Sequence, residues 1–181
     1  ERDGQNTQAS RTATVYAALV APILADRCTS CHDAGKSKAD LRLDTYELVL
    51  KGGTNGEVVV PGQPEKSKLV QSMVSPPDDD DHMPPPKKPQ PTTQEIALLS
   101  WWIREGASKD LTVAKATVPS ELKLYVKAQL SRSKTGSAGG APPVLLALAE
   151  AAALADPVVA EVMKKINGSG ASLAPVAADA K

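Results

Sequence analysis

The sequence contains no phenylalanine and only two tryptophans and three tyrosines in 181 residues. Aromatic side chains are the bulkiest residues of most protein cores, so a core in this chain must be filled largely by other means. Lys and Arg together number 21, and Asp and Glu together also number 21. This balance of charge gives no reason to expect nucleic acid or an anionic membrane as a partner.

Long apolar stretches are also missing. No run reaches the 18 or more apolar residues that a membrane-spanning helix requires. The chain opens with the polar residues 1–6 and shows no secretory signal peptide. If the protein works outside the cytoplasm, we therefore expect this chain to be a processed or excised piece.

Cysteine and histidine are scarce, with two of each. Both cysteines and one histidine lie in the segment Cys28–His32, which has the pattern C-x-x-C-H. This pattern is typical of the attachment site of a c-type haem. On one helical turn, two thiols three residues apart can reach the two vinyl groups along one porphyrin edge, and the adjacent imidazole falls beneath the iron. The segment predicts thioether attachment through Cys28 and Cys31, with His32 as the proximal iron ligand.

Three other uses of the two cysteines compete with this prediction: a disulfide, half of a zinc site, or a thioredoxin-like redox couple. A zinc site needs about four nitrogen or sulfur ligands, and the chain offers only Cys28, Cys31, His32 and His82. A thioredoxin-like motif requires a βαβ setting, which the flanking sequence does not suggest. Haem attachment is therefore favoured, and a buried porphyrin would also supply the apolar bulk that aromatic residues do not.

A helical pattern precedes the cysteines, with Val15, Leu19 and Ile23 spaced four residues apart on one face. Pro22 interrupts this pattern, because it removes a hydrogen bond to the carbonyl of Ala18. The sequence therefore predicts a helix that bends or restarts just before the cysteine motif.

Two sequences have the form of a helix capping box. Asp44 with Glu47 predicts the start of a short helix that ends at Gly52. Thr92 with Glu95 predicts the start of a longer helix, whose apolar stripe and closing glycine are Ile96, Leu99, Ile103 and Gly106. Between them, Pro64 is suited to the first position of a helix that runs to the prolines at 76–77.

The pattern divides the chain into three parts. Residues 1–11 are polar and expected to be disordered, and residues 12–110 form the main domain. Residues 111–181 are expected to be a helical extension with a Gly/Ser/Pro linker at 132–143. No catalytic constellation is visible in this extension. Its expected helices cover residues 120–131, 144–155 and 157–166.

A six-coordinate haem needs a second ligand opposite His32, and Met83 is favoured. It follows the motif by about 50 residues, in a proline-rich loop between two predicted helices, and prolines restrict the freedom of such a loop. His82 is the rival, since neighbouring side chains point in different directions and only one can bind. An open or water-bound position is the third alternative. Met73 lies on the apolar face of a predicted helix and is expected in the core.

The acidic run Asp78–Asp81 directly precedes His82. Carboxylate oxygens suit calcium, but four consecutive residues lack the spaced geometry of a calcium loop. A solvated acidic loop is therefore favoured. Near a haem edge, its negative field would favour the ferric state and steer basic partners.

Several segments occur in a specific order and spacing: Pro22–Leu24 before the cysteine motif, then Leu41–Thr45, Gly52–Gly53, Val60–Ser67, Pro76–Pro85 and Glu95–Ala107. Over residues 12–110, this series resembles the planctomycete-type cytochrome c domain. The resemblance implies an all-α, cytochrome c-like fold of a few helices packed around one covalently bound haem c, followed by the small helical extension.

The resemblance also implies roles for four residues: Cys28 and Cys31 as thioether attachments, His32 as proximal ligand and Met83 as distal ligand. Domains of this type resemble those of extracytoplasmic, periplasmic or membrane-anchored multidomain proteins. We therefore expect an extracytoplasmic location, and a longer membrane-anchored protein as the parent of this chain.

The leading functional hypothesis is a monohaem electron-transfer module that is not an enzyme and that works with redox partner proteins, without nucleic acid. With both axial positions of the iron bound, the haem can only exchange an electron. The alternative is a haem-based sensor or ligand-binding module with a displaceable Met83. A peroxidase-like enzyme is a third hypothesis, and it would need an open iron and His82 as its distal acid–base group.

Overall fold

The structure, a computed structural model, describes residues 12–133. Within this range it contains helices, turns and isolated bridges but no strand, which confirms the predicted all-α fold. None of the helices in this range is long and apolar enough to cross a membrane. Four predicted segments lie wholly or largely outside the described residues: the disordered segment 1–11, the linker 132–143, and the helices at 144–155 and 157–166.

The first helical stretch restarts at its proline, as predicted. A π-helical segment, Tyr16–Val20, leads directly into helix α2, Ala21–Arg27, which has Pro22 in its first turn. The Ala21 N–H donates to the carbonyl of Tyr16, five residues earlier. Because proline has no N–H to donate, a change of helical register at this point avoids an unmet bond inside a regular helix.

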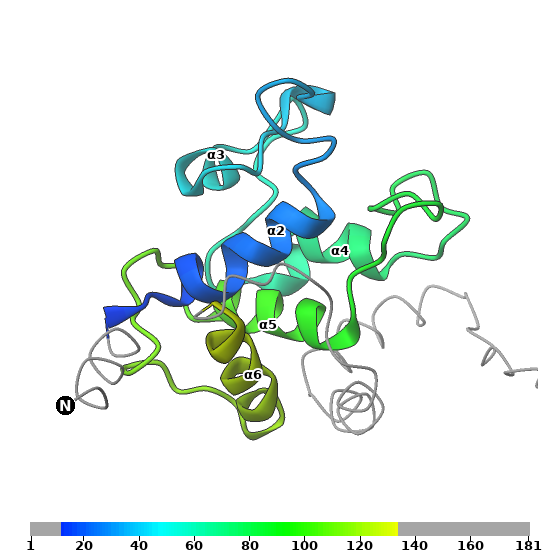
Figure 1. Ribbon diagram of the computed structural model, residues 1–181. Helices are drawn as coiled ribbons and strands as arrows, with labels where there is room; N and C mark the ends of the chain where they lie inside the picture. The colour runs from blue at the N-terminus through cyan, green and yellow to red at the C-terminus, as the bar shows by residue number, and fades with distance from the viewer. Residues whose placement is uncertain (1–11, 134–181) are drawn as a thin grey trace, which may run out of the picture.

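Helix α5, Thr93–Arg104, lies in the middle of the molecule, between α2 and α6, Lys123–Ser133 (Figure 1). The capping box predicted at its start is confirmed. The Glu95 N–H donates to Thr92 Oγ1 at 3.2 Å, and the Thr92 N–H donates to Glu95 Oε2 at 2.7 Å. The helix ends before Gly106, whose φ of +90° suits glycine.

Two helix starts differ from the sequence predictions. Helix α3, Tyr46–Lys51, has Thr45 at its N-cap and no side-chain cap, so the predicted Asp44–Glu47 capping box is wrong. The reason is local: Arg42 donates to both carboxylate oxygens of Asp44, from Nε to Oδ1 at 3.0 Å and from Nη2 to Oδ2, so the carboxylate is directed at the guanidinium and not at the N–H groups of the helix.

The second difference concerns the helix predicted to begin at Pro64. Residues Pro64–Lys66 form a separate 3₁₀ turn, and helix α4 covers Lys68–Val74. Ser67 separates the two, because its buried hydroxyl accepts from the Val60 N–H at 2.9 Å and donates to the Gln63 carbonyl at 3.0 Å. The predicted end of this helix before the prolines at 76–77 is confirmed.

Three of the five aromatic residues of the chain pack against one another. Trp102 is fully buried and its Nε1 donates to the Ser108 carbonyl at 3.0 Å. The ring of Tyr16 lies 5.6 Å from that of Trp102 and 5.1 Å from that of Tyr46. Aliphatic side chains make up most of the remaining buried cluster: Val15, Leu19, Val20, Ile23, Leu24, Val49, Val70, Leu98, Leu99, Ile103, Leu122 and Val126.

Residues 111–133 pack against the same core as the segments before them. The Val15 N–H donates to the Leu111 carbonyl at 2.8 Å, and Leu122 and Val126 of the last helical segments are buried in the common cluster. The division of the chain at residue 110 stays a prediction, since sharing a core does not fix a domain boundary.

Two loop regions define the side of the molecule where the site lies. The segment from the end of α2 through α3 stands over one side of the helices, and the proline-rich loop after α4 projects beside it (Figure 1). This loop, residues 76–91, is called the Met83 loop below.

Candidate functional site

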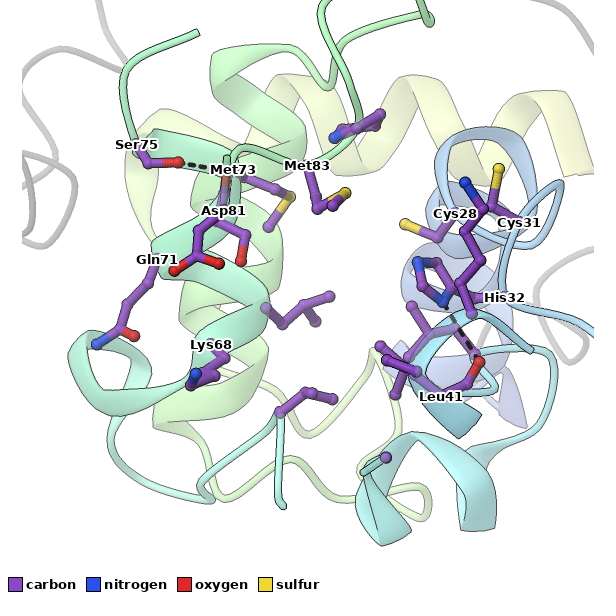
Figure 2. Close-up of a pocket in the computed structure, with 18 of the residues that line it drawn as sticks. Cys28, Cys31, His32, Leu41, Lys68, Gln71, Met73, Ser75, Asp81 and Met83 are labelled. Carbon is purple, nitrogen blue, oxygen red and sulfur yellow. Dashed lines mark hydrogen bonds between the residues drawn. The ribbon is translucent and has the colours of Figure 1, made fainter. Parts of the chain in front are cut away.

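A cavity of about 820 Å³ lies between these two regions. Its volume falls in the range typical of small-molecule and cofactor sites. Figure 2 shows Cys28, Cys31, His32 and Leu41 on one wall and residues of α4 and the Met83 loop on the other. The walls are mainly apolar, with contributions from Leu41, Leu43, Val58, Leu69, Met73, Pro76, Pro84 and Pro85.

The cysteine motif forms one hydrogen-bonded turn directly after α2. Cys28 ends the helix, donating its N–H to the Leu24 carbonyl at 2.9 Å. The N–H groups of Cys31 and His32 both donate to the Cys28 carbonyl at 3.1 Å. Cys28 and Cys31 are free thiols, and all three residues line the cavity. The turn thus brings both thiols and the imidazole to one wall, as the motif spacing requires.

The His32 ring is held by a backbone carbonyl. Its Nδ1 lies 3.3 Å from the carbonyl oxygen of Leu41 (Figure 2). Because that oxygen can only accept, Nδ1 carries the hydrogen and Nε2 keeps its lone pair for a metal ion. The Leu43 N–H donates to the His32 carbonyl at 2.8 Å and fixes the backbone as well. This is the arrangement typical of a histidine that ligates iron.

Burial changes the acidity of the Cys28 thiol. Desolvation raises the pKa of Cys28 to about 12, since burial disfavours the charged thiolate. The thiolate is the nucleophilic form, so in haem-free protein we expect Cys28 to react with iodoacetamide at pH 8 at least about tenfold more slowly than a free cysteine. Peptide mass spectrometry after timed quenching measures this rate. A Cys28 rate equal to that of the urea-unfolded chain would contradict the prediction.

Met83 lines the opposite wall of the cavity. Its N–H donates to the Ser72 carbonyl of α4 at 2.9 Å, and its side chain is 41% exposed. Met73 is 8% exposed and belongs to the buried cluster, so its predicted place in the core is confirmed. Its side chain also reaches the cavity, beside Met83 (Figure 2). Two thioethers therefore face the cavity from the same side.

His82 is directed away from the cavity. It is 8% exposed, and it is not one of the described residues that line the cavity. Its Nδ1 lies 2.8 Å from the Ser75 carbonyl oxygen, and its Nε2 lies 3.0 Å from Gln90 Oε1. Each ring nitrogen lies beside an oxygen acceptor outside the cavity, which disfavours His82 as the rival ligand.

The acidic run forms an exposed turn at the rim of the cavity. The Asp79 N–H donates to the Pro76 carbonyl at 3.0 Å, and the Asp81 N–H donates to Asp79 Oδ1 at 2.8 Å. Among residues 12–133, no group of three or more His, Cys, Asp or Glu side chains is arranged to hold a metal ion. The choice between a solvated acidic loop and a calcium site stays a prediction.

One ion pair at the site was not foreseen from the sequence. Arg27, directly before Cys28, donates from Nε to Glu95 Oε2 at 3.2 Å and from Nη2 to Glu95 Oε1 at 3.1 Å. The two side chains are only 19% and 10% exposed, and the Glu95 carboxylate raises the pKa of Arg27 above its usual value. The partners are 68 residues apart, so no sequence spacing signals the pair.

The residues present fit a c-type haem. One wall provides two thiols within a single turn and an imidazole with a free Nε2, while the other wall provides a thioether. The surrounding walls are mainly apolar, as a porphyrin requires. Thiol, imidazole and thioether together are the donor set of a His/Met cytochrome.

Comparison with known proteins agrees with haem attachment at the cysteine motif. The family model described as Planctomycete cytochrome C matches residues 28–87, which include the cysteine motif and Met83. Searches among curated proteins and among solved structures gave no match. Cytochrome c domains carry haem c and serve haem-based electron transfer, and Cys28 and Cys31 fit the covalent attachment. Residues 28–87 thus lie in a cytochrome c domain of the planctomycete type, and the described residues 12–133 around them have an all-α fold.

Proposed function

We propose that the protein carries one haem c and transfers single electrons through it, with the iron held between His32 and Met83. The observation that supports this most directly is the thioether of Met83 on the wall opposite His32 (Figure 2). When bound, haem supplies an iron that exchanges one electron. If His32 and Met83 both hold the iron, no position would remain on it for a substrate, so we propose a carrier rather than an enzyme.

Each residue of the proposed site has a distinct task. Cys28 and Cys31 anchor the porphyrin, and the Leu41 carbonyl keeps His32 Nε2 directed at the cavity. When haem is bound, the apolar walls would exclude water from it, and the thioether of Met83 would favour the ferrous state and raise the reduction potential.

Replacement of Met83 tests the proposed ligand. The ferric wild-type protein is expected to show the weak red-region absorption band of thioether-to-iron charge transfer, and Met83→Ala is expected to lose it completely. The matched control is Met73→Leu, since Met73 also reaches the cavity from the same side. We expect this variant to keep the band. Its loss in Met73→Leu, with retention in Met83→Ala, would reassign the ligand to Met73.

A ligand-binding or sensor function is the second candidate, and the 41% exposure of Met83 favours it. A partly exposed thioether, which is a weak ligand, can be displaced by a small molecule. Rapid carbon monoxide binding by the ferrous protein would support this candidate, whereas slow or absent binding supports electron transfer.

We also propose an extracytoplasmic, periplasmic location, which is typical of cytochrome c domains of this type, and redox partner proteins as the interaction partners. The exposed run Asp78–Asp81 at the cavity rim would attract a partner with a basic surface. The longer membrane-anchored parent protein remains a proposal that rests on the resemblance alone.

A further inference from the structure

We propose that His82 and Gln90 are positioning residues, which hold the Met83 loop so that Met83 faces the cavity. This inference rests on the proposed function, in which Met83 is an iron ligand. It gives His82 a role that differs from the ligand role considered for it from the sequence.

The Met83 loop has few backbone donors for its length. Proline has no N–H, and the loop contains prolines at positions 76, 77, 84, 85, 86, 89 and 91. A loop of this composition cannot satisfy its carbonyl groups by its own backbone, so it depends on side-chain donors or water. Its shape is therefore sensitive to any side chain that supplies them.

Gln90 supplies such donors. Its Nε2 lies 3.0 Å from the Pro84 carbonyl oxygen, 3.0 Å from that of Pro85 and 2.9 Å from that of Lys88. The amide group thus sits inside a ring of three carbonyl oxygens on the segment that directly follows Met83. With Nε2 facing three acceptors, Oε1 is directed the other way, toward His82.

His82 links this ring to helix α4. One ring nitrogen lies 3.0 Å from Gln90 Oε1, and the other lies 2.8 Å from the carbonyl oxygen of Ser75, which caps the C-terminus of α4. Carbonyl groups at a helix end lack a partner within the helix, so Ser75 offers a ready acceptor. The His82 ring is buried, so water competes little for these contacts.

Met83 lies between the two anchored parts. The chain before it is held to α4 by the His82 ring, the Met83 N–H donates to the Ser72 carbonyl at 2.9 Å, and the chain after it encircles the Gln90 amide. The contacts fix the backbone on both sides of Met83, whereas the side chain itself is 41% exposed. The network thus fixes the backbone that carries the Met83 thioether, while packing around the side chain restrains it only partly.

The test measures the affinity with which imidazole replaces Met83 in the ferric protein. Loss of the red-region band reports the replacement. Gln90→Ala removes the amide, and Gln90→Glu keeps the size but replaces the donor by an acceptor. In both variants we expect imidazole to bind at least about tenfold more tightly than in the wild type, since the exposed and part-buried hydrogen bonds from Gln90 Nε2 to the carbonyl groups of the loop are lost. Lys87→Ala is the matched control, because its exposed side chain lies in the same loop but outside the network.

His82→Leu separates positioning from ligation. We expect this variant to keep the red-region band in the absence of imidazole and to bind imidazole more tightly, as Gln90→Ala does. Loss of the band together with a changed axial-ligand spectrum would assign a ligand role to His82 and overturn the proposal. Imidazole affinities within about twofold of the wild type in both Gln90 variants would also overturn it.

Hydrogen exchange provides a readout that does not depend on iron ligation. In Gln90→Ala, the amide hydrogens of Met83 and Lys88 are expected to exchange at least about tenfold faster, while that of Trp102 in α5 is unchanged. If the wild type lacks the red-region band, Met83 is not the ligand. If these amides nevertheless exchange faster in Gln90→Ala than in the wild type, the positioning of the loop by Gln90 stands. Unchanged exchange at both amides refutes the positioning itself.

Discussion

Replacing Cys28 and Cys31 together by serine is expected to abolish covalent haem attachment. A serine hydroxyl does not form the thioether that a cysteine thiol forms with a porphyrin vinyl group. Both thiols line the cavity within one turn. They are the only two cysteines of the chain, so no other cysteine can take their place. The wild-type chain should keep its haem after denaturing electrophoresis and acid–acetone extraction, whereas the double variant should release all of it. Intact-mass measurement of the purified protein quantifies the difference.

The single variants and a control make this result specific. Cys28→Ser and Cys31→Ser should each keep one thioether bond, with the absorption maximum of the pyridine complex intermediate between two bonds and none. Ser30→Ala lies in the same turn, is exposed, and should attach haem normally. Haem that remains bound to the denatured double variant would mean that attachment occurs elsewhere. A wild-type mass without haem, but two hydrogens below the reduced chain, would favour the disulfide instead.

Local rules predicted the helices well where no strong competitor lies nearby. Thr92 and Glu95 form their capping box because both groups lie in the same helical turn. Pro22 forces a restart because its missing N–H is a property of the residue itself. Asp44 has the same capping chemistry as Thr92, but Arg42 lies two residues away and binds its carboxylate. A charged neighbour thus overrides a local preference.

The site was predictable to the extent that its residues are close in sequence. The spacing of C-x-x-C-H places both thiols and the imidazole on one turn, and the prolines around Met83 mark a restricted loop. The direction of a side chain is a different matter. His82 was a reasonable rival for Met83 by residue type, yet its ring faces Ser75 and Gln90 because of how the loop folds onto α4. Contacts of this kind depend on tertiary packing.

Glu95→Ala is expected to lower the free energy of unfolding by about 2–4 kcal/mol. The variant removes both oxygens that hold Arg27, and it removes the acceptor for the Thr92 N–H at the start of α5. Arg27 would then be a poorly solvated charge without its partner, which is the costly outcome for a mostly buried pair. Urea unfolding of the haem-loaded protein, followed by circular dichroism, measures the change.

Controls separate the ion pair from the helix cap. Glu57→Ala changes an exposed acid and should alter stability by less than about 0.5 kcal/mol. Glu95→Gln keeps an acceptor for the Thr92 N–H but loses the charge, so it should fall between the wild type and Glu95→Ala. The double-mutant cycle with Arg27→Ala isolates the pair itself. A coupling energy near zero would contradict the prediction.

The position of Glu95 gives this pair a consequence beyond stability. Its carboxylate accepts hydrogen bonds from Arg27, the residue directly before Cys28, and from the N–H of Thr92, the residue directly after the Met83 loop. One carboxylate thus joins the segments that carry both proposed axial ligands. We therefore expect Glu95→Ala to lose the red-region band at a lower urea concentration than the helical signal. If the two signals are lost together in this variant, the pair stabilises the fold as a whole and does not hold the two ligand segments together.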